Sequence, residues 1–591
     1  MKNRKRPVTT NENTENNQIL KSLEPLAEKP DDASIINNQA SAVPDQTSPG
    51  TGIGYIATKI TPVNTAILEE IGHDDKAIKR SKEFIAHMIE RTTGLFYDDN
   101  TDPFAIVKIN GHEEYHPIKG LTFEDILRSC YWELHHSSLP NDILKLVRDD
   151  FAAKAKYDSS SLGLVRLDNR ITGDNKKIIY SICDREWKAI QITPDGWNII
   201  QEPARFRKYP KIQRAQVMAV SGGNVKDLLD FLTIQDPDHQ ILLLVYIIYA
   251  FIPHVAKPIL YMSGPQGSAK STNSEFIKKI VDPTCVDQVN LSVSLRDTAL
   301  TLFQNYAVVF DNLSKLTQRQ NDLLCQAATG GGIMRRKLRT DEDAIVFRLK
   351  DCIIMNGIDC VAARADLLDR SILIETQRLD EEKRIPKSEL DEHFQSKLPE
   401  ILGAIFDALS RMMRLLPNVR LNKYPRMAEF ARYGYAIAEA INIGGDRFIR
   451  AYYKNMEEHN RQVVESNAVS NCLMQFIRQQ IDCEWSGMMN DLLIGLNSIY
   501  VSMEHDPKNK NWPATASHLS RLINRVKVNI EGLGLKIDIK RTSKGSHIDI
   551  KYVPPQIPSS ASLSESTESC LADSLPETDE VAKSCTAAMT A

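Results

Sequence analysis

The chain has 591 residues, a formal net charge of −4, 42% hydrophobic residues and 25% charged residues. This length predicts three or four domains with sizeable cores, and the composition is typical of a soluble globular protein. The net charge excludes an overall basic coat for nucleic acid, so any such binding must depend on local patches.

The ten cysteines are scattered and include no C-x-x-C pair, so neither a zinc ribbon nor a redox motif is indicated. This usage suits a reducing compartment, and we expect a cytoplasmic protein. The N-terminus lacks the apolar core of a signal peptide. The most apolar run, ILLLVYIIYAFI (241–252), is too short to span a bilayer, so we expect a buried helix and no membrane partner.

The N-terminal third divides into two parts. Residues 1–75 are polar and show no apolar period, which predicts a disordered arm. Residues 76–235 predict an α+β accessory domain, because a helical stretch is followed by short strand-like runs. The predicted strands include FAIVKING, YHPIKG, SLGLVRL and KKIIYSICD.

The remainder divides into four parts. Residues 236–385 alternate apolar strand-like runs with helical stretches, which predicts an α/β core with a parallel sheet flanked by helices. Residues 386–484 show helical periodicity, residues 485–553 form a smaller C-terminal unit, and residues 554–591 predict a disordered acidic tail.

GPQGSAKST (264–272) fits the phosphate-loop pattern G-x-x-x-x-G-K-[ST] except at Ala269. The stretch lies between the predicted strand PILYMSG and the predicted helix STNSEFIKKIV, where backbone N–H groups and the helix N-terminus favour phosphate. Lys270 would reach the β- and γ-phosphates of ATP, and the Ser271 hydroxyl would bind Mg²⁺. The predicted ATP-binding residues are Gly264, Pro265, Gln266, Gly267, Ser268, Ala269, Lys270, Ser271 and Thr272.

Alanine at position 269 is expected to be compatible with a working loop. The residue before the lysine lies near the start of the predicted helix, where alanine is a good helix former. Gly267 remains available for the bend.

Polar residues also follow two later apolar runs. YAVVFDN places Asp311 at the end of a predicted strand, where it would hold the metal together with Ser271. CIIMNG ends a third strand with Asn356, which would contact the γ-phosphate or the attacking water, although Asn-Gly is also a favoured turn. Arg370 and, second to it, Arg364 are candidates to stabilise transition-state charge across a subunit boundary. Structural ion pairing is an equal alternative for both arginines.

The order of these motifs, with QAATGGGIMRRKLRTDEDAIVF between Asp311 and Asn356, resembles the superfamily 3 helicases. These are AAA+ ATPases of viruses, phages and plasmids, and the order looks in particular like their poxvirus- and phage-type primase-helicase branch. It covers roughly residues 236–380, with weaker similarity to about residue 553. The resemblance implies an AAA+-like sheet, a hexameric ring, ATP sites shared between subunits and single-stranded DNA in the pore.

Asn312 departs from this pattern, because many such ATPases carry a water-activating glutamate there. Asparagine can orient a water but cannot take its proton. Hydrolysis is therefore expected to be slow, or to use a base from elsewhere, for which Glu342 and Asp343 are candidates.

Two basic segments are candidate DNA contacts. One follows three glycines that permit an exposed hairpin, and a solvated loop is its alternative. The other is a helix and β-ribbon within residues 515–553, the outline of a winged helix, where eight Lys/Arg stand against three Asp/Glu. A structural domain with ordinary surface lysines is the alternative there. The predicted contacts are Arg335, Arg336, Lys337 and Arg339 in the first segment, and Arg521, Arg525, Lys540, Arg541 and Lys544 in the second.

Together these features predict an ATP-dependent DNA helicase or translocase from the replication module of a virus, phage or other mobile element. The expected partners are single-stranded DNA, duplex DNA and further copies of the chain. One alternative is a weakly hydrolysing, ATP-switched replication initiator or loader. Another is a primase-helicase whose N-terminal domain is catalytic, although no convincing acidic pair is present there.

Overall fold

The structure is a computed structural model. It describes residues 75–313, 316–336, 344–349, 352–357, 365–378, 382, 384–503, 512–543 and 545–554, and for residues 335, 336, 344, 345 and 365 it describes the backbone only. The expected arm (1–75) and tail (554–591) lie outside the described residues, apart from residues 75 and 554.

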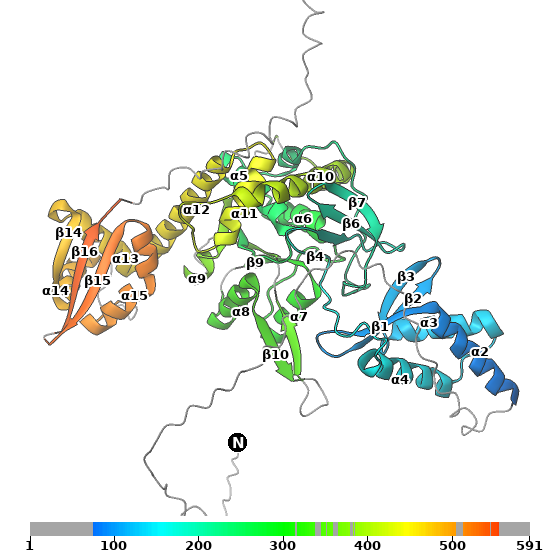
Figure 1. Cartoon of the computed structure of the whole chain (residues 1–591). Helices are drawn as coiled ribbons and strands as arrows, with labels where there is room; N and C mark the ends of the chain where they lie inside the picture. The colour runs from blue at the N-terminus through cyan, green and yellow to red at the C-terminus, as the bar shows by residue number, and fades with distance from the viewer. Residues whose placement is uncertain are drawn as a thin grey trace, which may run out of the picture. The chain divides into compact units, whose positions relative to one another are not determined.

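The N-terminal unit packs helices on a small antiparallel sheet with strand order β1-β2-β3 (Figure 1). Its core is a separate cluster that includes Phe84 of α2, Phe123 of α3 and Phe151 of α4. Its elements are α2 (Asp75–Arg91), β1 (Thr92–Tyr97), β2 (Pro103–Ile109), β3 (His112–Pro117), α3 (Leu121–His135) and α4 (Asn141–Tyr157).

The run SLGLVRL, expected to be a strand, forms none. It contributes one isolated bridge, from Leu164 to Tyr97, and Leu164 is 58% exposed. The backbone of this run lies beside β1, where the Leu162 amide donates to the Leu95 carbonyl oxygen (2.8 Å) and the Val165 amide donates to the Tyr97 carbonyl oxygen (2.9 Å), without forming a continuous strand ladder.

A four-stranded antiparallel meander comes next and packs into the central core. Tyr180 of β5 and Ile192 of β6 belong to the same buried cluster as Tyr249 of α5 and Phe406 of α10. The central core therefore includes residues on both sides of residue 235, the expected end of the accessory domain. The elements are β4 (Ile171–Gly173), β5 (Ile178–Ser181), β6 (Lys188–Thr193), β7 (Gly196–Gln201) and a 3₁₀ helix, η1 (Val225–Phe231).

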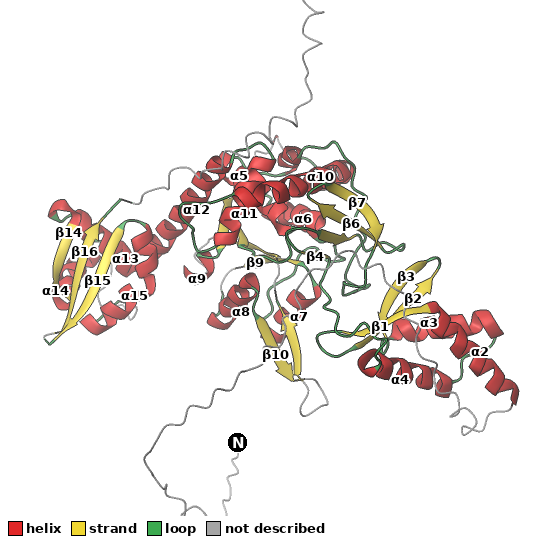
Figure 2. Cartoon of the chain, viewed as in Figure 1, coloured by secondary structure: helices red, strands yellow, loops and turns green. Residues whose placement is uncertain are grey.

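The central sheet is parallel, with strand order β13-β8-β12-β9, and helices lie on its faces, so the chain is an α/β protein (Figure 2). Alternate residues of each strand enter different clusters. Met262 and Ile354 pack with Phe276 of α6, whereas Tyr261 and Met355 pack on the other face with Leu324 of α8.

The elements of this region follow the βα alternation that the sequence predicts. They are α5 (Pro237–Ala250), β8 (Ile259–Ser263), α6 (Lys270–Val281), α7 (Leu295–Gln304), β9 (Ala307–Leu313), α8 (Gln318–Thr329), β10 (Gly332–Arg336), β11 (Ala344–Arg348), β12 (Cys352–Gly357), α9 (Ala365–Leu368) and β13 (Ser371–Glu375). Strands β10 and β11 form a separate two-stranded antiparallel pair.

Helix α5 confirms the expected buried helix, because every residue from Ile241 to Ala250 is buried. A helix that is apolar on all sides lies in a protein core or in a membrane. Among the described helices, none has the length and apolar character that crossing a bilayer requires.

The C-terminal half continues with helices and ends in a three-stranded antiparallel sheet of order β14-β16-β15. Helix α13 belongs with this end, because its Cys472 and Leu473 share a core with Leu496 of α14 and Ile523 of α15. The elements are α10 (Lys387–Leu415), α11 (Ala428–Ala440), α12 (Gly445–Ser466), α13 (Ala468–Arg478), β14 (Glu484–Met488), α14 (Met489–Ser502), α15 (Ala516–Gly532), β15 (Leu535–Thr542) and β16 (Gly545–Tyr552).

A buried ionic cluster joins the central sheet to the meander. Asp282, which follows α6, accepts from Arg170 Nε (3.0 Å), from Lys278 Nζ (3.0 Å), and from the backbone amides of Tyr306 and Ala307 (2.9 and 3.1 Å). Arg170 is fully buried and also donates to four backbone carbonyls. One carboxylate thus fixes the end of α6, the start of β9 and the residue before β4.

Replacing Asp282 by asparagine should strongly destabilise the fold. The substitution leaves Arg170 and Lys278 buried without a carboxylate, and breaking a buried pair in this way costs about 3–5 kcal/mol. Urea unfolding measures the loss. Asp238→Asn is the control, because Asp238 pairs with Lys454 at 2.6 Å while their side chains are 32% and 66% exposed. The control should lose less than about 1 kcal/mol, and equal losses would contradict the assignment.

The pH dependence gives a second readout of the same cluster. Burial alone would raise the pKa of Asp282, but Lys278, Arg170 and the Ala307 amide outweigh it and lower the pKa from 3.8 to about 2. The folded-state pKa of Asp282 lies below that of the unfolded chain. The stabilisation by the ionised carboxylate is therefore complete above pH 3.8 and disappears as the pH falls through about 2. Asp282→Asn should remove this component of the acid dependence.

Candidate functional site

Residues 264–272 connect the C-terminal end of β8 to the N-terminus of α6, as the sequence predicts. Gly264 has φ +149°, and a Cβ there would lie 2.4 Å from the Thr376 carbonyl oxygen, so glycine is required. Ser268 is buried, and its Oγ hydrogen-bonds to Thr376 Oγ1 at 2.8 Å. The loop is therefore fastened to the residue after β13. Pro265, Gln266 and Gly267 form its exposed tip.

Ala269 is not in a helical conformation. The expectation that alanine is tolerated there as a good helix former is therefore wrong. The φ and ψ of Ala269 are 59° and 23°, in the left-handed region, and the residue precedes the first residue of α6. Alanine is strained there by about 1–2 kcal/mol, whereas glycine is not. The missing glycine of the motif thus falls at a position whose backbone favours glycine.

Lys270 is the first residue of α6, and its side chain folds back over the loop. Its Nζ donates to the carbonyl oxygens of Gly264 (2.7 Å) and Pro265 (2.8 Å). Burial lowers the pKa of the Lys270 amine, and the charge of Asp311 partly opposes this shift. The ammonium group is therefore held beside the loop amides, where an anion could replace the carbonyl contacts.

Asp311 lies beside Ser271, and Asn356 completes the group. Ser271 Oγ donates to Asp311 Oδ2 (3.0 Å), and Asn356 Nδ2 donates to Asp311 Oδ1 (2.9 Å) and to Ser274 Oγ (2.8 Å). The strand alternation described above puts both Asp311 and Asn356 on the α6 face. Their positions at the carboxyl ends of β9 and β12 therefore bring them to the start of α6.

The Oδ1 atom of Asn356 is buried and has no hydrogen-bond partner among the described residues. Buried polar atoms are normally paired, so this acceptor is available to a donor from outside the described residues, such as a bound water. Hydroxyl and carboxylate oxygens near a helix N-terminus and a lysine are also the donor set that Mg²⁺ and a polyphosphate require. These residues fit Mg²⁺–ATP.

Asn312, directly after Asp311, is exposed and has φ +56°. It lies where the pairing of β9 with β12 changes register. The left-handed backbone of Asn312 therefore determines where its side chain points.

Arg370 lies at the amino ends of the parallel strands, whereas the loop lies at their carboxyl ends. It precedes β13, whose first residue, Ser371, pairs with Ile259 at the start of β8. The loop follows the other end of β8, so Arg370 is roughly 15 Å from it at the rise of a β-strand. Arg370 Nη1 donates to the Asp366 carbonyl oxygen (2.6 Å), and its Nε has no partner among the described residues. Arg364 lies outside the described residues.

A groove of about 500 Å³ surrounds Arg370. Leu323 and Cys325 of α8 form part of its wall, together with Arg319 and Asp366. This position keeps Arg370 out of reach of the loop of its own subunit.

The first basic segment is only partly described. Arg335 and Arg336 are in β10, whose pairing with β11 places them in a two-stranded hairpin, but their side chains are outside the description. Lys337 and Arg339, together with Glu342 and Asp343, lie outside the described residues. Met334 in the same strand is 73% exposed.

In the second basic segment, α15 exposes Arg521 and Arg525 and buries Leu519 and Ile523. On β15, Arg541 is exposed, but Lys540 Nζ lies 2.9 Å from Asp538 and 3.6 Å from Asp549. The charge of Lys540 is therefore partly neutralised by its own hairpin. Lys544 lies outside the described residues.

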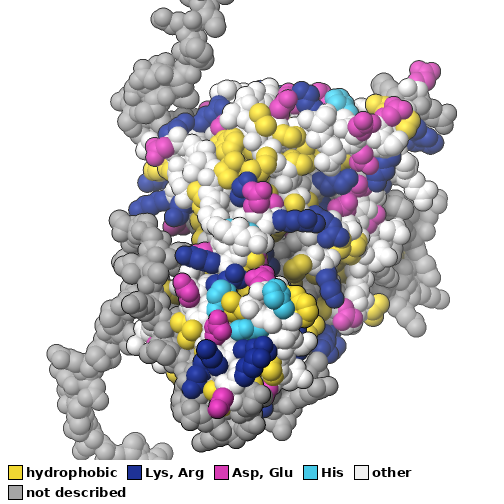
Figure 3. Space-filling view, turned by 90° about the vertical axis from the view of Figure 1, so that its right-hand side faces the viewer, with side chains coloured by type: hydrophobic (Ala, Val, Ile, Leu, Met, Phe, Trp, Pro, Cys, Tyr) yellow, Lys and Arg dark blue, Asp and Glu magenta, His cyan; other side chains and the backbone are white. Residues whose placement is uncertain are grey.

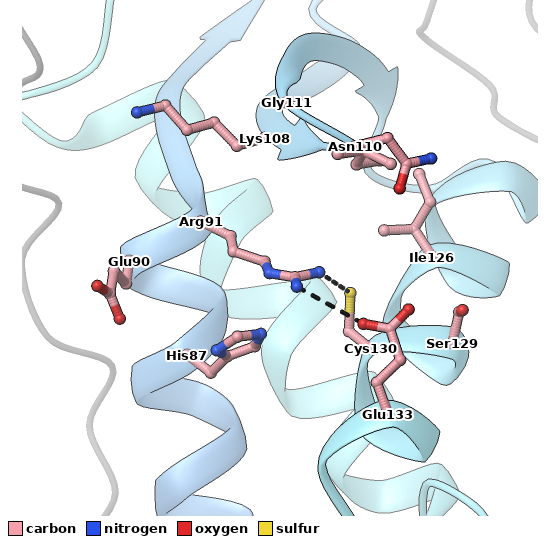
Figure 4. A pocket seen from close by; sticks show the side chains of 11 residues that line it. His87, Glu90, Arg91, Lys108, Asn110, Gly111, Ile126, Ser129, Cys130 and Glu133 are labelled. Atoms are coloured by element: carbon pink, nitrogen blue, oxygen red, sulfur yellow. Dashed lines mark hydrogen bonds and ion pairs between the residues drawn. The ribbon is translucent and has the colours of Figure 1, made fainter.

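A separate cavity of about 510 Å³ lies in the N-terminal unit, between α2, α3 and the β2–β3 turn (Figure 4). Arg91 reaches across it and donates to Cys130 Sγ (3.3 Å), with Glu133 Oε2 at 3.5 Å from its Nη2. Glu90 and Glu133 balance the charges of Arg91 and Lys108, so the cavity has no excess of positive charge to attract a polyphosphate.

Basic and acidic side chains also alternate on the face shown in Figure 3, where histidines gather in its lower part. Within the described residues, no group of three or more His, Cys, Asp or Glu side chains is arranged to hold a metal ion.

Thr376 and Ser274 are site residues that sequence reasoning missed. Thr376 lies one residue beyond the polar end of the run SILIE, so the signal that identified Asp311 and Asn356 points to its neighbour Glu375. Ser274 carries no comparable signal, because its contact with Asn356 depends on the packing of α6 on the sheet.

Residues 225–459 match a family described as actinomycete integrative conjugative element replication protein, and residues 469–563 match the C-terminal domain of that family. Together the matches cover more than half of the chain. No curated protein matches the sequence.

Among solved structures, one apo structure of the NrS-1 C-terminal region is 10% identical, covers 81% of this chain and 100% of its own, and has a TM-score of 0.36. A second apo form is 12% identical and covers 80% and 99%, with a TM-score of 0.37. Values at this level carry no inference about function.

Glycine at position 269 should stabilise the protein. Relief of the left-handed strain exceeds the entropy that glycine loses on folding, so Ala269→Gly should raise the free energy of unfolding by up to about 1 kcal/mol. Ala269→Val should lower it, and urea unfolding measures both. If residue 269 were instead part of the helix, glycine would lower stability by about 1 kcal/mol.

Proposed function

The chain belongs to the family of actinomycete integrative conjugative element replication proteins, and on this premise we propose that it is an ATP-dependent DNA helicase or translocase. The observation that carries the proposal is the convergence of Lys270, Ser271 and Asp311 at the start of α6. In a replication protein, ATP hydrolysis at such a site would supply the energy for movement along DNA.

The chain's own residues divide the binding of Mg²⁺–ATP among them. The loop amides of 264–272 and the α6 N-terminus attract the phosphates, and Lys270 exchanges its carbonyl contacts for phosphate oxygens. Ser271 and Asp311 hold Mg²⁺, while Asn356 orients the Asp311 carboxylate through its Nδ2. When bound, the nucleotide supplies the γ-phosphoryl group whose hydrolysis releases the energy for movement.

The active form is a ring of identical subunits, hexameric by the resemblance, in which Arg370 of one subunit serves the ATP site of the next. Its distance from its own loop supports this arrangement. So does its place in the lining of an open groove, which a neighbouring subunit could enter.

Single-stranded DNA binds to the β10–β11 hairpin, and duplex DNA binds to the C-terminal unit. That unit runs in the order α13-β14-α14-α15-β15-β16, which suits a winged helix with α15 as its exposed helix. Arg521, Arg525 and Arg541 are among its exposed cations. Lys540 contributes less, because Asp538 and Asp549 already hold it.

Asn312 favours a second candidate, a weakly hydrolysing ATP-switched replication initiator or loader. The residue after Asp311 offers no carboxylate to accept a proton from water. In that case ATP binding alone would change the affinity for DNA. The rate of ATP turnover with and without single-stranded DNA separates the two candidates, since only the motor needs DNA-stimulated turnover.

Loss of the Lys270 ammonium should abolish most of the turnover. Removing one preorganised charge-stabilising donor typically lowers kcat by about 10²–10³, so Lys270→Ala should lose that much of the DNA-stimulated rate. Lys279→Ala is the matched control, because Lys279 lies near the other end of α6 and pairs with Glu275. Its rate should stay near that of the wild type. Equal rates for all three proteins would refute the proposed site.

Mixing two inactive variants tests Arg370. A site formed by Lys270 of an Arg370→Ala subunit and Arg370 of a Lys270→Ala neighbour is complete, so random mixing in a closed ring restores about a quarter of the sites. We expect ATP turnover to reappear on mixing and to be absent from each variant alone. Mixed rings that are verified by native mass spectrometry and remain inactive would contradict a role between subunits.

A further inference from the structure

Strand β9 contains one residue more than its partner β12 at the candidate site. Phe310 pairs with Met355, and Leu313 pairs with Gly357, so Asp311 and Asn312 together oppose the single residue Asn356. This is a β-bulge, and bulges next to active sites redirect side chains. Asn312 has φ +56°, and asparagine is among the few residues other than glycine that adopt this conformation readily.

The bulge changes which face each side chain occupies. In a regular strand, residues 311 and 313 would share a face. Instead Asp311 lies on the α6 face, against Ser271, while Leu313 is buried on the opposite face in the cluster of Phe310 and Met355. The extra residue therefore lets a polar and an apolar side chain, two positions apart, point to opposite sides of the sheet.

Packing beyond the bulge leaves little freedom. A Cβ on Gly357 would lie 2.3 Å from the Tyr261 hydroxyl and 3.3 Å from the Leu313 carbonyl oxygen. The strands are thus fixed at Leu313 and Gly357, and the extra residue is pushed outward, where Asn312 is exposed.

We infer that Asn312 is a positioning residue, which holds the bulge that aims Asp311 at Ser271 and takes no part in activating water. This inference rests on the proposed function and explains the departure from glutamate. Glutamate at 312 would be strained by the left-handed backbone, and its carboxylate would start from a position that points to solvent. Proton transfer from water then belongs to another group, and Asn312 acts through Asp311.

The test uses the full-length chain with three substitutions. Asn312→Gly accepts the backbone conformation and has no side chain, Asn312→Val strongly disfavours it, and Asn312→Glu adds the carboxylate. Calorimetry with ATP, with and without Mg²⁺, measures affinity, and DNA-stimulated turnover measures kcat. Asn442→Val is the matched control, because Asn442 also has a left-handed backbone (φ +54°) but lies between α11 and α12, away from the site.

Glycine at 312 should keep both the Mg²⁺-dependent affinity and kcat close to those of the wild type. Valine should weaken the Mg²⁺-dependent affinity by about tenfold or more, the equivalent of the left-handed strain, and leave Mg²⁺-free affinity unchanged. Glutamate should give no increase in kcat. Asn442→Val should lower the unfolding temperature as Asn312→Val does, without affecting Mg²⁺.

Two results would overturn the inference. One is a glycine variant that keeps affinity but loses kcat as severely as Lys270→Ala, which would make the Asn312 side chain a direct participant. The other is a valine variant that behaves like the wild type. If the wild type binds no ATP, the proposed function fails instead. Thermal unfolding without nucleotide then tests the bulge. The bulge is supported if the glycine variant unfolds at or above the temperature of the wild type and clearly above that of the valine variant. Any other order refutes it.

Discussion

The geometry of the candidate site depends on one buried carboxylate at the far end of α6. Asp282 binds Lys278 of the same helix and the two amides that begin β9, so helix and strand are joined at that end. From this junction α6 runs back to Ser271 and β9 runs forward to Asp311, and the two side chains meet at 3.0 Å. Arg170 extends the same fixation to the meander. Because desolvated charges are stable only when each is paired, the three groups must be ordered together.

The parts of the site that follow from chain periodicity were predictable. Apolar runs ending in a polar residue identified the loop, Asp311 and Asn356, since parallel strands bring their carboxyl ends to one edge. Backbone conformation was not predictable in the same way. Ala269 and Asn312 have left-handed φ values that neither sequence neighbour demands; the attachment of the loop to Thr376 and the register of β9 against β12 impose them. Whether a given position is helical or left-handed is decided by such tertiary contacts.

Charge in the sequence proved a weaker guide than strand pattern. Lys540 is basic in sequence but is held by two aspartates of its own hairpin, and Arg91 faces Glu133 across a cavity. A count of lysines and arginines cannot detect these pairs, because Asp549 and Glu133 come from a different strand or helix, which meets its partner only in the fold. Arg370 illustrates the converse. Its sequence position suggested a catalytic role, and only the strand register established that its own loop is out of reach.

The meander β4–β7 buries its apolar residues against α5 and α10, in a core that the sequence pattern had divided at residue 235. A recombination event that joined two ancestral genes at that residue would have separated Tyr180 from Phe406 and Arg170 from Asp282. Inheritance of the central sheet therefore carries the meander with it. The upstream unit has a core of its own around Phe84, Phe123 and Phe151, yet the other face of its sheet packs Phe104 against Ile179 of the meander, so it too is adapted to the meander.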